Sequence, residues 1–174
     1  MARTPAAGAP AATVAFWRWL LPLACVVVTL AVFWPVLGHQ FVDWDDDITL
    51  VNNPGYRGLG GANLRWMLTT TLMGHWVPAT WITFGVDHVF WGMNPRGYHL
   101  TSLLLHAATA AAVYVVARRL LRAAMTGSDG AVEWGALAAA LVFAIHPLRV
   151  ESVAWVTERR DVTSGLWFVL TILA

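Results

Sequence analysis

Four aspartates lie within five positions, at Asp43, Asp45, Asp46 and Asp47. Carboxylates this close together repel one another, so the cluster suits either a bound cation or one carboxylate that is ready to accept a proton. The ordinary alternative is a solvated acidic turn. The neighbours Val42, Trp44 and Ile48 place the cluster against an apolar surface, and this favours a site that does chemistry.

A second group of ionisable side chains lies between residues 146 and 161. Guanidinium groups match phosphate oxygens, so Arg149, Arg159 and Arg160 are candidates for binding a phosphate at the headgroup level of a membrane. Helical spacing from Glu151 onward predicts a surface helix that continues through Glu158. The ordinary alternative is an interfacial connector whose charges face water. The group consists of His146, Arg149, Glu151, Glu158, Arg159, Arg160 and Asp161.

His99 and His106 lie seven residues apart, on one face of a long apolar stretch. Ionisable residues inside a membrane span usually face protein or a cavity, so both are candidate site residues. For His106 we expect a structural hydrogen bond to a neighbouring helix rather than catalysis. A zinc site fits poorly, because the pair lacks the i, i+3 or i, i+4 spacing of helical metal sites and no cysteine assists it.

The composition indicates which elements must position these residues. Of the 174 residues, 58% are hydrophobic and 12% are charged, about half the charge of a soluble globular domain. This argues against a cytosolic enzyme and a disordered chain, and the net charge of +1 argues against a nucleic-acid-binding protein. The apolar residues are collected into runs, which indicates membrane spans of about 20 residues.

We predict four spans, over residues 19–38, 98–117, 132–148 and 162–174. The first two have no charge over twenty positions each. The third is short enough to be a buried helix or a re-entrant segment, although tilt or local thinning of the bilayer allows it to cross. The fourth has thirteen residues, so we expect the chain to be an N-terminal part of a longer protein, cut inside this span. A short core helix is the alternative.

The arginines predict the orientation, since the chain has no lysine. Arg118, Arg119 and Arg122 follow the second span, while residues 39–97 carry five aspartates against three arginines. The positive-inside rule therefore puts the N-terminus and this arginine cluster in the cytoplasm, and both groups of candidate residues outside. We predict a multi-pass protein of a bacterial inner membrane or the endoplasmic reticulum membrane, with its active side periplasmic or lumenal.

Two segments lie outside the predicted spans. Residues 1–18 are predicted to be a disordered cytoplasmic tail before an uncleaved signal anchor, because the apolar run is long and no cleavage site follows it. The external loop over residues 39–97 is rich in tryptophan. Within it, residues 63–73 and 81–91 are predicted to be short helices in the membrane interface, the first with Asn63 as its N-cap.

Several spaced motifs follow one another along the chain. They are residues 41–47 (FVDWDDD), 52–54 (NNP), 75–81 (HWVPATW), 91–100 (WGMNPRGYHL), 146–155 (HPLRVESVAW) and 158–162 (ERRDV). Together and in this order, they resemble the TMTC-like membrane glycosyltransferases, multi-span proteins of the GT-C class whose bacterial members are linked to tetratricopeptide repeats. The resemblance extends from about Gly38 to the C-terminal end.

The resemblance implies an all-α membrane protein, a multi-span helical bundle of GT-C type, of which residues 19–174 form the N-terminal part. It also implies an enzyme that moves a sugar, with mannose as the candidate, from a polyprenyl-phosphate carrier to an acceptor hydroxyl on protein or another molecule. The partners are then this donor, the acceptor and the lipid bilayer, and not nucleic acid. The one cofactor that the resemblance allows for is a divalent cation, Mg²⁺ or Mn²⁺, held by Asp45 and Asp46.

The resemblance also assigns roles to individual residues. Asp45 would take the proton from the acceptor hydroxyl as it attacks the anomeric carbon, and Asp46 would orient it or help to hold the cation. Arg159, with His146, would bind the carrier phosphate and stabilise the departing charge. The remaining candidates are Glu151, Asp161 and Arg149 at the donor, with Asn53, His75, His99 and His106 in supporting positions.

Two other classes of protein remain open. One is a membrane-anchored tetratricopeptide-repeat scaffold without transferase activity, and the complete aspartate cluster argues against it. The other is a transporter that uses Asp and His within the membrane, and the placement of the acids in connections and tails rather than in spans argues against it. With fewer than four complete spans, the chain is expected to carry an incomplete site.

Overall fold

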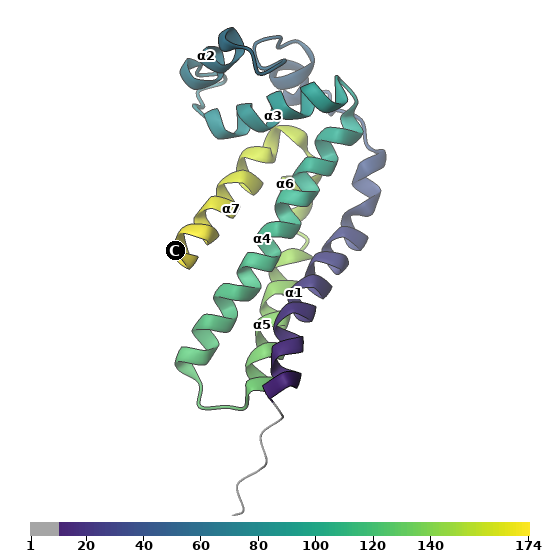
Figure 1. Ribbon diagram of the computed structural model, residues 1–174. Coiled ribbons are helices and arrows are strands. Elements are labelled where there is room, and N and C mark those ends of the chain that lie inside the picture. Colours follow the sequence, from purple (N-terminus) through teal and green to yellow (C-terminus); the bar gives the residue numbers. More distant parts are fainter. Residues whose placement is uncertain (1–10) are drawn as a thin grey trace, which may run out of the picture.

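The computed structural model describes residues 11–174, with side chains from Trp17 onward, and this part of the chain is almost entirely helical. Three long helices form a bundle, α1 (Ala11–Phe33), α4 (Pro95–Ala124) and α5 (Asp129–Ala144) (Figure 1). Over the described range, the only strand-like feature is an isolated β-bridge between Leu72 and His75. The all-α class expected from the sequence is therefore confirmed for these residues.

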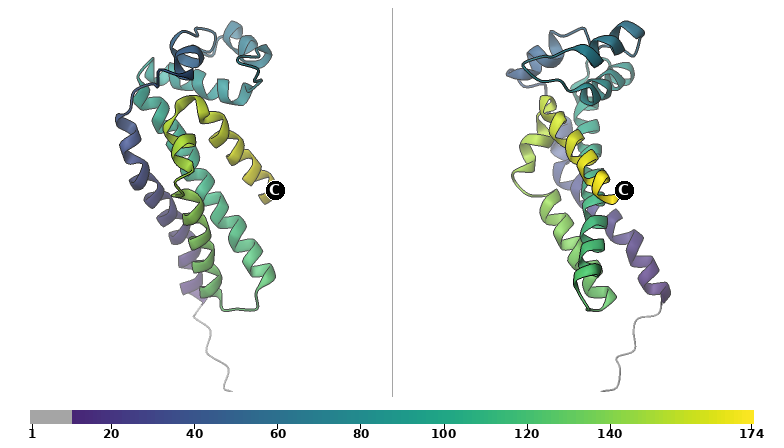
Figure 2. Two further views of the ribbon diagram at one scale, coloured as in Figure 1. Left: turned by 180° about the vertical axis from the view of Figure 1, so that it is seen from behind. Right: turned by 90° about the vertical axis from the view of Figure 1, so that its left-hand side faces the viewer.

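A small head lies across the end of the bundle at which α4 begins (Figures 1 and 2). It contains α2 (Gly61–Thr69) and α3 (Pro78–Trp91). A further helix, α7 (Arg159–Leu173), packs along the half of α4 that is nearer to the head. The short connecting elements are η1 (Trp34–Gly38), η2 (Asp47–Val51), α6 (Arg149–Ala154) and η3 (Val156–Glu158).

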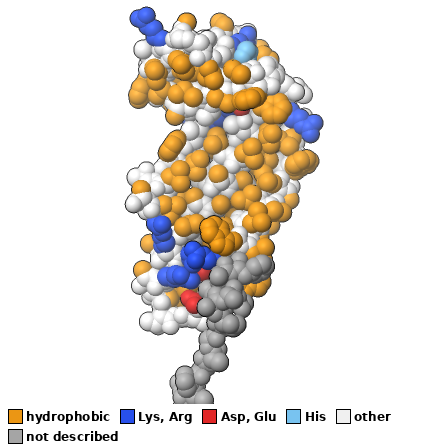
Figure 3. Space-filling model, in the orientation of Figure 1, with side chains coloured by type: hydrophobic (Ala, Val, Ile, Leu, Met, Phe, Trp, Pro, Cys, Tyr) orange, Lys and Arg blue, Asp and Glu red, His pale blue; other side chains and the backbone are white. Residues whose placement is uncertain are grey.

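Two helical segments are long and apolar enough to cross a membrane, Trp17–Gly38 and Pro95–Ala124. They contain the first two predicted spans. Hydrophobic side chains cover most of the bundle face seen in Figure 3, and the charged side chains of that face gather toward its two ends. The helices α5 and α7 overlap the third and fourth predicted spans, whose crossing of a membrane stays a prediction.

Side-chain caps and prolines fix where the helices of the bundle begin. Asn94 precedes α4, and its Oδ1 atom accepts a hydrogen bond from the backbone N–H of Arg96 at 3.1 Å. Pro95 occupies the first helical position, where its missing N–H costs no hydrogen bond. Ser128 caps α5 in the same manner, accepting from the N–H of Ala131 at 3.4 Å. The Ser128 cap therefore fixes where the turn between α4 and α5 ends.

The start of the first helix and the cap of α2 differ from the sequence predictions. The predicted tail over residues 1–18 overlaps α1, which begins at Ala11, because alanine favours the helix. The rest of that tail lies outside the described residues. The N-cap of α2 is Gly60 rather than Asn63, whose side-chain amide donates to the Gly55 carbonyl at 3.0 Å.

The predicted continuous helix from Glu151 through Glu158 is wrong. α6 ends at Ala154, and Trp155 is extended, with φ −98° and ψ 118°. The backbone N–H of Thr157 points to a carboxylate of a distant segment, Asp46, at 2.9 Å, in place of a helical carbonyl. A tertiary hydrogen bond therefore overrides the helical periodicity at this point and lets α7 start in a new direction.

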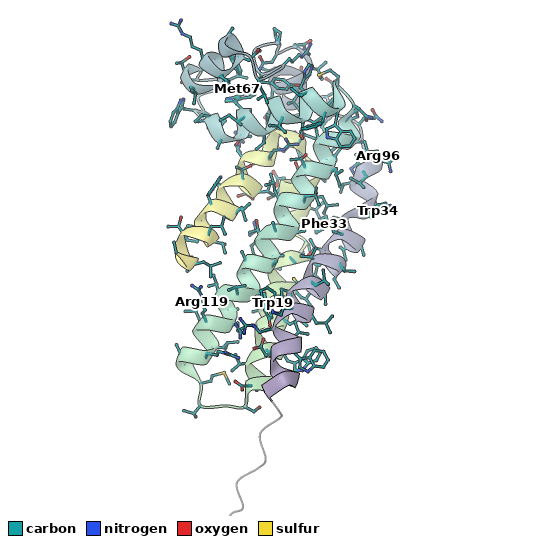
Figure 4. The ribbon with its side chains drawn as sticks, in the orientation of Figure 1. Trp19, Phe33, Trp34, Met67, Arg96 and Arg119 are labelled. Atoms are coloured by element: carbon teal, nitrogen blue, oxygen red, sulfur yellow. The ribbon has the colours of Figure 1, made fainter. Side chains whose placement is uncertain are left out.

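The buried apolar side chains form three clusters along the molecule. One lies between α1, α4 and α5, where Ala110, Ala136 and Ala140 are fully buried and let the helices approach closely. The second fills the head around Tyr56, Met67 and Trp81, and the third joins α1, α4 and α7. In Figure 4, the labelled Met67 lies in the head and Trp19 lies toward the opposite end of the bundle.

A buried carboxylate holds α4 and α5 together at the end away from the head. The Glu133 side chain is 3% exposed and accepts a hydrogen bond from the Tyr114 hydroxyl. Arg118 donates to it from Nε at 2.7 Å and Arg122 from Nη2 at 3.0 Å. We call these four residues the hairpin cluster. Its charges compensate one another, as a buried ionic group requires.

Candidate functional site

Asp46 is fully buried where the loop before the head meets the connection between α6 and α7. Its Oδ1 atom accepts hydrogen bonds from the Thr157 backbone N–H at 2.9 Å and from the Thr157 hydroxyl at 2.6 Å. Its Oδ2 atom accepts from the backbone N–H of Val42 at 2.9 Å. These bonds bring the aspartate cluster into contact with the second group of ionisable residues, and they occupy the Asp46 carboxylate.

Asp45, the preceding residue, lines a cavity of about 90 Å³ between the head and the start of α7, which we call the first cavity. The polar residues of its wall are Asp45, Thr49, His75, Thr80, Thr157 and Arg160, and Trp81 and Phe84 form part of its apolar side. The cavity is small and open on one side, so reacting groups can enter it from solvent.

Two local structures bring His75 and Arg160 to this cavity. The β-bridge closes a tight turn in which Met73 and Gly74 have left-handed φ values of 52° and 81°, and it returns His75 toward the cavity. Arg160 belongs to the first turn of α7, its side chain is one-third exposed, and it is paired with Glu158. Both side chains keep contact with solvent, so both are accessible to a ligand.

Arg159, which was predicted to bind a phosphate, is fully buried and saturated with partners. Its Nε atom donates to the Ser102 hydroxyl at 3.1 Å and its Nη2 atom to the Tyr98 carbonyl at 2.5 Å. Its Nη1 atom is paired with Asp87 at 2.5 Å, and its guanidinium lies 4.4 Å from the centre of the Phe84 ring. In this structure, Arg159 joins α3, α4 and α7 and does not reach the first cavity.

Asp87 lies on α3 and provides the negative charge for this buried arginine. Burial raises the pKa of its carboxyl, and the Arg159 guanidinium and the Thr101 hydroxyl, which donates to Oδ1 at 2.6 Å, act against that rise. The ion pair is deeply buried, with side-chain exposures of 0% for the arginine and 3% for the aspartate. Each of these two buried side chains therefore needs the opposite charge of the other to remain ionised in the protein interior.

A second cavity, of about 250 Å³, lies on another side of the first turn of α7. Asp161 and Arg149 line it with His106, and the distance between Arg149 Nη1 and Asp161 Oδ2 is 3.5 Å. The ring of His106 is also bonded to the Ala144 carbonyl through Nε2 at 2.8 Å, which is the expected structural hydrogen bond to a neighbouring helix. Successive residues of a helix point about 100° apart, so Arg159, Arg160 and Asp161 face three different surroundings.

The other predicted residues lie outside both cavities. Asn53 closes its own turn, donating to the Thr49 carbonyl at 3.1 Å and accepting from the Gly55 N–H at 3.0 Å. His99 is buried on α4, with its ring edge-on to that of His39 at 6.0 Å between centroids. His146 and Glu151 are exposed, and His146 accepts from the Leu148 N–H at 3.2 Å.

The residues that the resemblance offers to a divalent cation do not form a site in this structure. Within residues 11–174, no three His, Cys, Asp or Glu side chains converge on one point. The carboxylate of Asp46 already accepts three hydrogen bonds, so it is not free to join Asp45 in holding a cation.

Sequence reasoning missed two residues of this region, Thr157 and Asp87, and left a third, Arg160, among several phosphate candidates. Thr157 carries no charge and gave no signal before the structure showed it bonded to the aspartate cluster. Asp87 stood out only as an acid inside an apolar stretch, which in retrospect signals a buried partner. Arg160 was noted as a phosphate candidate but not chosen, since sequence spacing alone does not separate it from Arg159.

Comparison with known proteins gives relatives but no matching family model or solved structure. Protein O-mannosyl-transferase Tmtc1 of Drosophila melanogaster is 36% identical over 101 residues, which are 58% of this chain and 11% of that protein. Protein O-mannosyl-transferase Tmtc2 of the same fly is 31% identical over 161 residues, 87% of this chain and 16% of that protein. Human protein O-mannosyl-transferase TMTC1 is 31% identical over 150 residues, 79% of this chain and 16% of its own length.

The long apolar helices and the polar cavity at one end of their bundle define a class, a helical protein with two helices long and apolar enough to cross a membrane and with a polar site at one end. Within this class, the chain belongs to the TMTC-like family, as its motifs predicted, and it is homologous to one part of these longer proteins. It spans between 11% and 16% of the length of the three relatives.

Proposed function

We propose that the protein containing this chain transfers a sugar from a polyprenyl-phosphate donor to the hydroxyl group of an acceptor. The observation that carries this proposal is the first cavity, where a carboxylate, Asp45, and a guanidinium, Arg160, line one small space. A carboxylate suits the proton of the acceptor, and a guanidinium suits the phosphate of the donor. The names of the relatives support mannose as the sugar and protein as the acceptor.

In the proposed reaction, the acceptor oxygen attacks the anomeric carbon of the donor sugar. The bond between this carbon and the phosphate oxygen breaks, and the bonding electron pair leaves with the lipid phosphate. Asp45 takes the proton that the acceptor hydroxyl loses. Arg160 stabilises the negative charge that develops on the departing phosphate, and His75 is close enough to the same cavity to contact either group.

This assignment changes two roles that the resemblance implies. Arg160 takes the place of Arg159, since every nitrogen of the Arg159 guanidinium already has a partner in the protein. Asp46 becomes a positioning residue, because it bonds Thr157 in the wall of the first cavity. Through these bonds, Asp46 helps to hold Asp45 and the first turn of α7 around one space.

We place the reaction at the outer face of a multi-pass membrane protein whose N-terminus is cytoplasmic. Arg118, Arg119 and Arg122 support this orientation, because they lie near the end of α4 away from the head, and the positive-inside rule assigns such clusters to the cytoplasm. Figure 4 labels Arg119 in that half of the molecule and Arg96 beside the head. The head and both cavities then face the periplasm or the lumen.

A sugar-transfer assay on membranes that contain the full-length protein tests this proposal. With a polyprenyl-phosphate-mannose donor, we expect Asp45→Asn to lower the rate about 100-fold or more, the usual contribution of a general base. The exposed neighbour in the same cluster provides a matched control, and Asp43→Asn should keep the wild-type rate. In the same assay, Arg160→Gln should raise KM for the donor, whereas Arg96→Gln on the exposed start of α4 should not.

Wild-type transfer by both Asp45→Asn and Arg160→Gln would overturn the assignment of the first cavity. The absence of any transfer by the wild-type protein, with every donor tried, would favour the membrane-anchored scaffold instead. These two results are distinguishable, because the first requires an active wild-type enzyme and the second an inactive one.

A further inference from the structure

The second cavity takes no part in the proposed transfer, and its lining combines charge with apolar surface. It lies between α4, α5 and α7, and Phe143, Phe168 and Val169 form its apolar part. Arg149 and Asp161 are the charged residues of its wall. A cavity whose wall combines a charged pair with apolar side chains matches an amphiphile, whose headgroup and chain need different surroundings.

The two charges of this cavity form a long ion pair with each other and are partly exposed to solvent. Their closest atoms, Arg149 Nη1 and Asp161 Oδ2, are 3.5 Å apart, longer than the 2.7–2.9 Å of a charge-assisted hydrogen bond. Their side chains are 36% and 47% exposed. The Arg149 guanidinium lies 4.8 Å from the centre of the Phe143 ring, and the Ser152 hydroxyl donates to Asp161 Oδ2 at 2.6 Å. Phe143 and Ser152 thus each hold one of the two charged groups in place, and the exposed part of each group can bind a ligand of opposite charge.

We propose that the second cavity binds one phospholipid with a phosphoethanolamine headgroup. The phosphate pairs with Arg149, the primary ammonium donates to the Asp161 carboxylate, and an acyl chain occupies the space beside Phe143, Phe168 and Val169. A guanidinium donates two parallel hydrogen bonds to phosphate oxygens, and an ammonium group has three N–H donors for a carboxylate. This lipid is distinct from the donor of the proposed transfer reaction, and the inference does not depend on that reaction.

Charge complementarity selects this headgroup over its alternatives. A lipid whose headgroup carries only a phosphate would form the ion pair with Arg149 but would place a negative charge beside Asp161. A choline headgroup carries a quaternary ammonium, which has no N–H to donate to the carboxylate. A zwitterion with a primary ammonium satisfies both charges at once, which is what a pair of fixed opposite charges at a cavity mouth requires.

Gly165 allows the cavity to be filled without a clash. It lines the second cavity, and a Cβ atom added at this glycine would meet no heavy atom within 4 Å. The leucine side chain of Gly165→Leu should therefore occupy the space that the acyl chain uses. The helix tolerates this change, because leucine favours a helix more than glycine does. Gly130, at the start of α5, is exposed and equally open, so Gly130→Leu is a matched control outside the cavity.

The test uses the full-length protein in phosphatidylcholine vesicles. Each vesicle preparation contains a trace of a photoactivatable phosphatidylethanolamine, phosphatidylcholine or phosphatidylglycerol with identical acyl chains. We expect the phosphatidylethanolamine probe to crosslink to peptides of α7 and α5 with the highest yield. Asp161→Asn should lower this preference about tenfold, because it replaces the ionic partner of the ammonium, and about tenfold corresponds to ~1.4 kcal/mol.

Two further variants test phosphate binding and chain binding. Arg149→Gln should lower crosslinking by all three probes, because each headgroup carries a phosphate, and Gly165→Leu should also lower crosslinking by all three probes, with Gly130→Leu at the wild-type yield. Equal yields from the ethanolamine and choline probes, or a highest yield from the anionic glycerol probe, would overturn the proposal. An unchanged yield in Gly165→Leu would do the same, and the two charge variants keep the test decisive if that variant fails to fold.

Discussion

Asp45 and Asp46 are adjacent in the sequence, but their side chains have different surroundings. They begin a helical turn, so their side chains point about 100° apart. Asp45 faces the first cavity, and Asp46 faces the connection between α6 and α7, where Thr157 and Val42 supply three hydrogen bonds. A carboxylate with its oxygens bonded in this way positions its neighbours and is poorly placed to accept a proton from a substrate.

This difference predicts the behaviour of Asp46→Asn. The variant keeps the size of the side chain, but its amide group can accept at one atom only and cannot accept from the Val42 N–H through nitrogen. We expect the free energy of unfolding to fall by about 1.5–3 kcal/mol, the usual contribution of hydrogen bonds to a charged group. The measurement is the unfolding transition of the full-length protein in micelles, followed by tryptophan fluorescence.

A matched control and a second readout separate positioning from catalysis. Asp43→Asn removes an exposed carboxylate of the same cluster and should change stability by less than about 0.5 kcal/mol. Thr157→Ser keeps both donors to Asp46 and should retain transfer, whereas Thr157→Val should lower it. Equal stability of Asp46→Asn and the wild type would show that these hydrogen bonds do not hold the two segments together.

The sequence was enough to predict that two groups of ionisable residues lie on one side of the membrane, but not which of two neighbouring side chains reaches the cavity. The acidic cluster and the group over residues 146–161 were both expected outside, and Asp46 joins them through Thr157. The roles of Arg159 and Arg160 depend on where α7 starts and in which direction its first turn points. That direction is set by tertiary hydrogen bonds, which leave no trace in the local pattern of residue types.

At the scale of elements, the ion pair of Arg159 and Asp87 fixes the head to the bundle. Asp87 lies on α3 in the head, and Arg159 lies on α7 and also bonds Ser102 of α4. Three helices therefore share one guanidinium. Because Arg160 follows directly, the pair also decides which side of α7 faces the first cavity, so the buried residue positions the exposed one.

We predict that this ion pair behaves as one unit. Arg159→Met should lower the free energy of unfolding by about 3–5 kcal/mol, because it leaves the Asp87 carboxylate buried without its partner. The double variant Arg159→Met with Asp87→Asn should recover a large part of this loss, since no unpaired charge remains. A double-mutant cycle on the full-length protein measures the coupling directly.

The cycle also has an outcome that contradicts this view of the ion pair. If the two single variants and the double variant show additive losses, the charges do not depend on each other. The conservative Arg159→Lys should fall between the wild type and Arg159→Met, because a lysine has one charged centre and cannot bond Ser102, Tyr98 and Asp87 together.

Helix positions were largely predictable, because apolar runs of known length report them directly. The runs over residues 19–38 and 98–117 lie within α1, η1 and α4. The boundaries that differ have specific causes. Trp155 is extended where helical spacing predicted a continuous helix, since Thr157 bonds Asp46. Asn63 was expected to cap α2 but bonds the Gly55 carbonyl, so its side chain serves a turn and not the helix end.

At the scale of the whole molecule, polar interactions lie at both ends of an apolar bundle. Asp46, Asp45 and Arg159 lie near the head, and the hairpin cluster around Glu133 lies near the turn between α4 and α5. Between them, the buried residues are mostly apolar or small. The hairpin cluster was not predicted, because Glu133 and the arginines of α4 looked like separate boundaries of two spans.

The separation of the two ends predicts that Glu133→Gln lowers stability without changing the reaction. The variant removes the charge that Arg118, Arg122 and the Tyr114 hydroxyl share, so the free energy of unfolding should fall by about 3 kcal/mol. Asp129→Asn is the matched control: its carboxylate is 63% exposed and 3.6 Å from Arg122, so its loss should cost less than about 0.5 kcal/mol.

The sugar-transfer assay tests whether the hairpin cluster has only a structural role. Below the unfolding temperature of the variant, Glu133→Gln should retain both kcat and KM, because no residue of the hairpin cluster lines either cavity. Its loss of stability should also add to that of Asp46→Asn, since distant sites without shared partners behave independently. A raised KM in Glu133→Gln, or losses that fail to add, would mean that the turn between α4 and α5 communicates with the head through α4, and the two ends would then form one coupled unit.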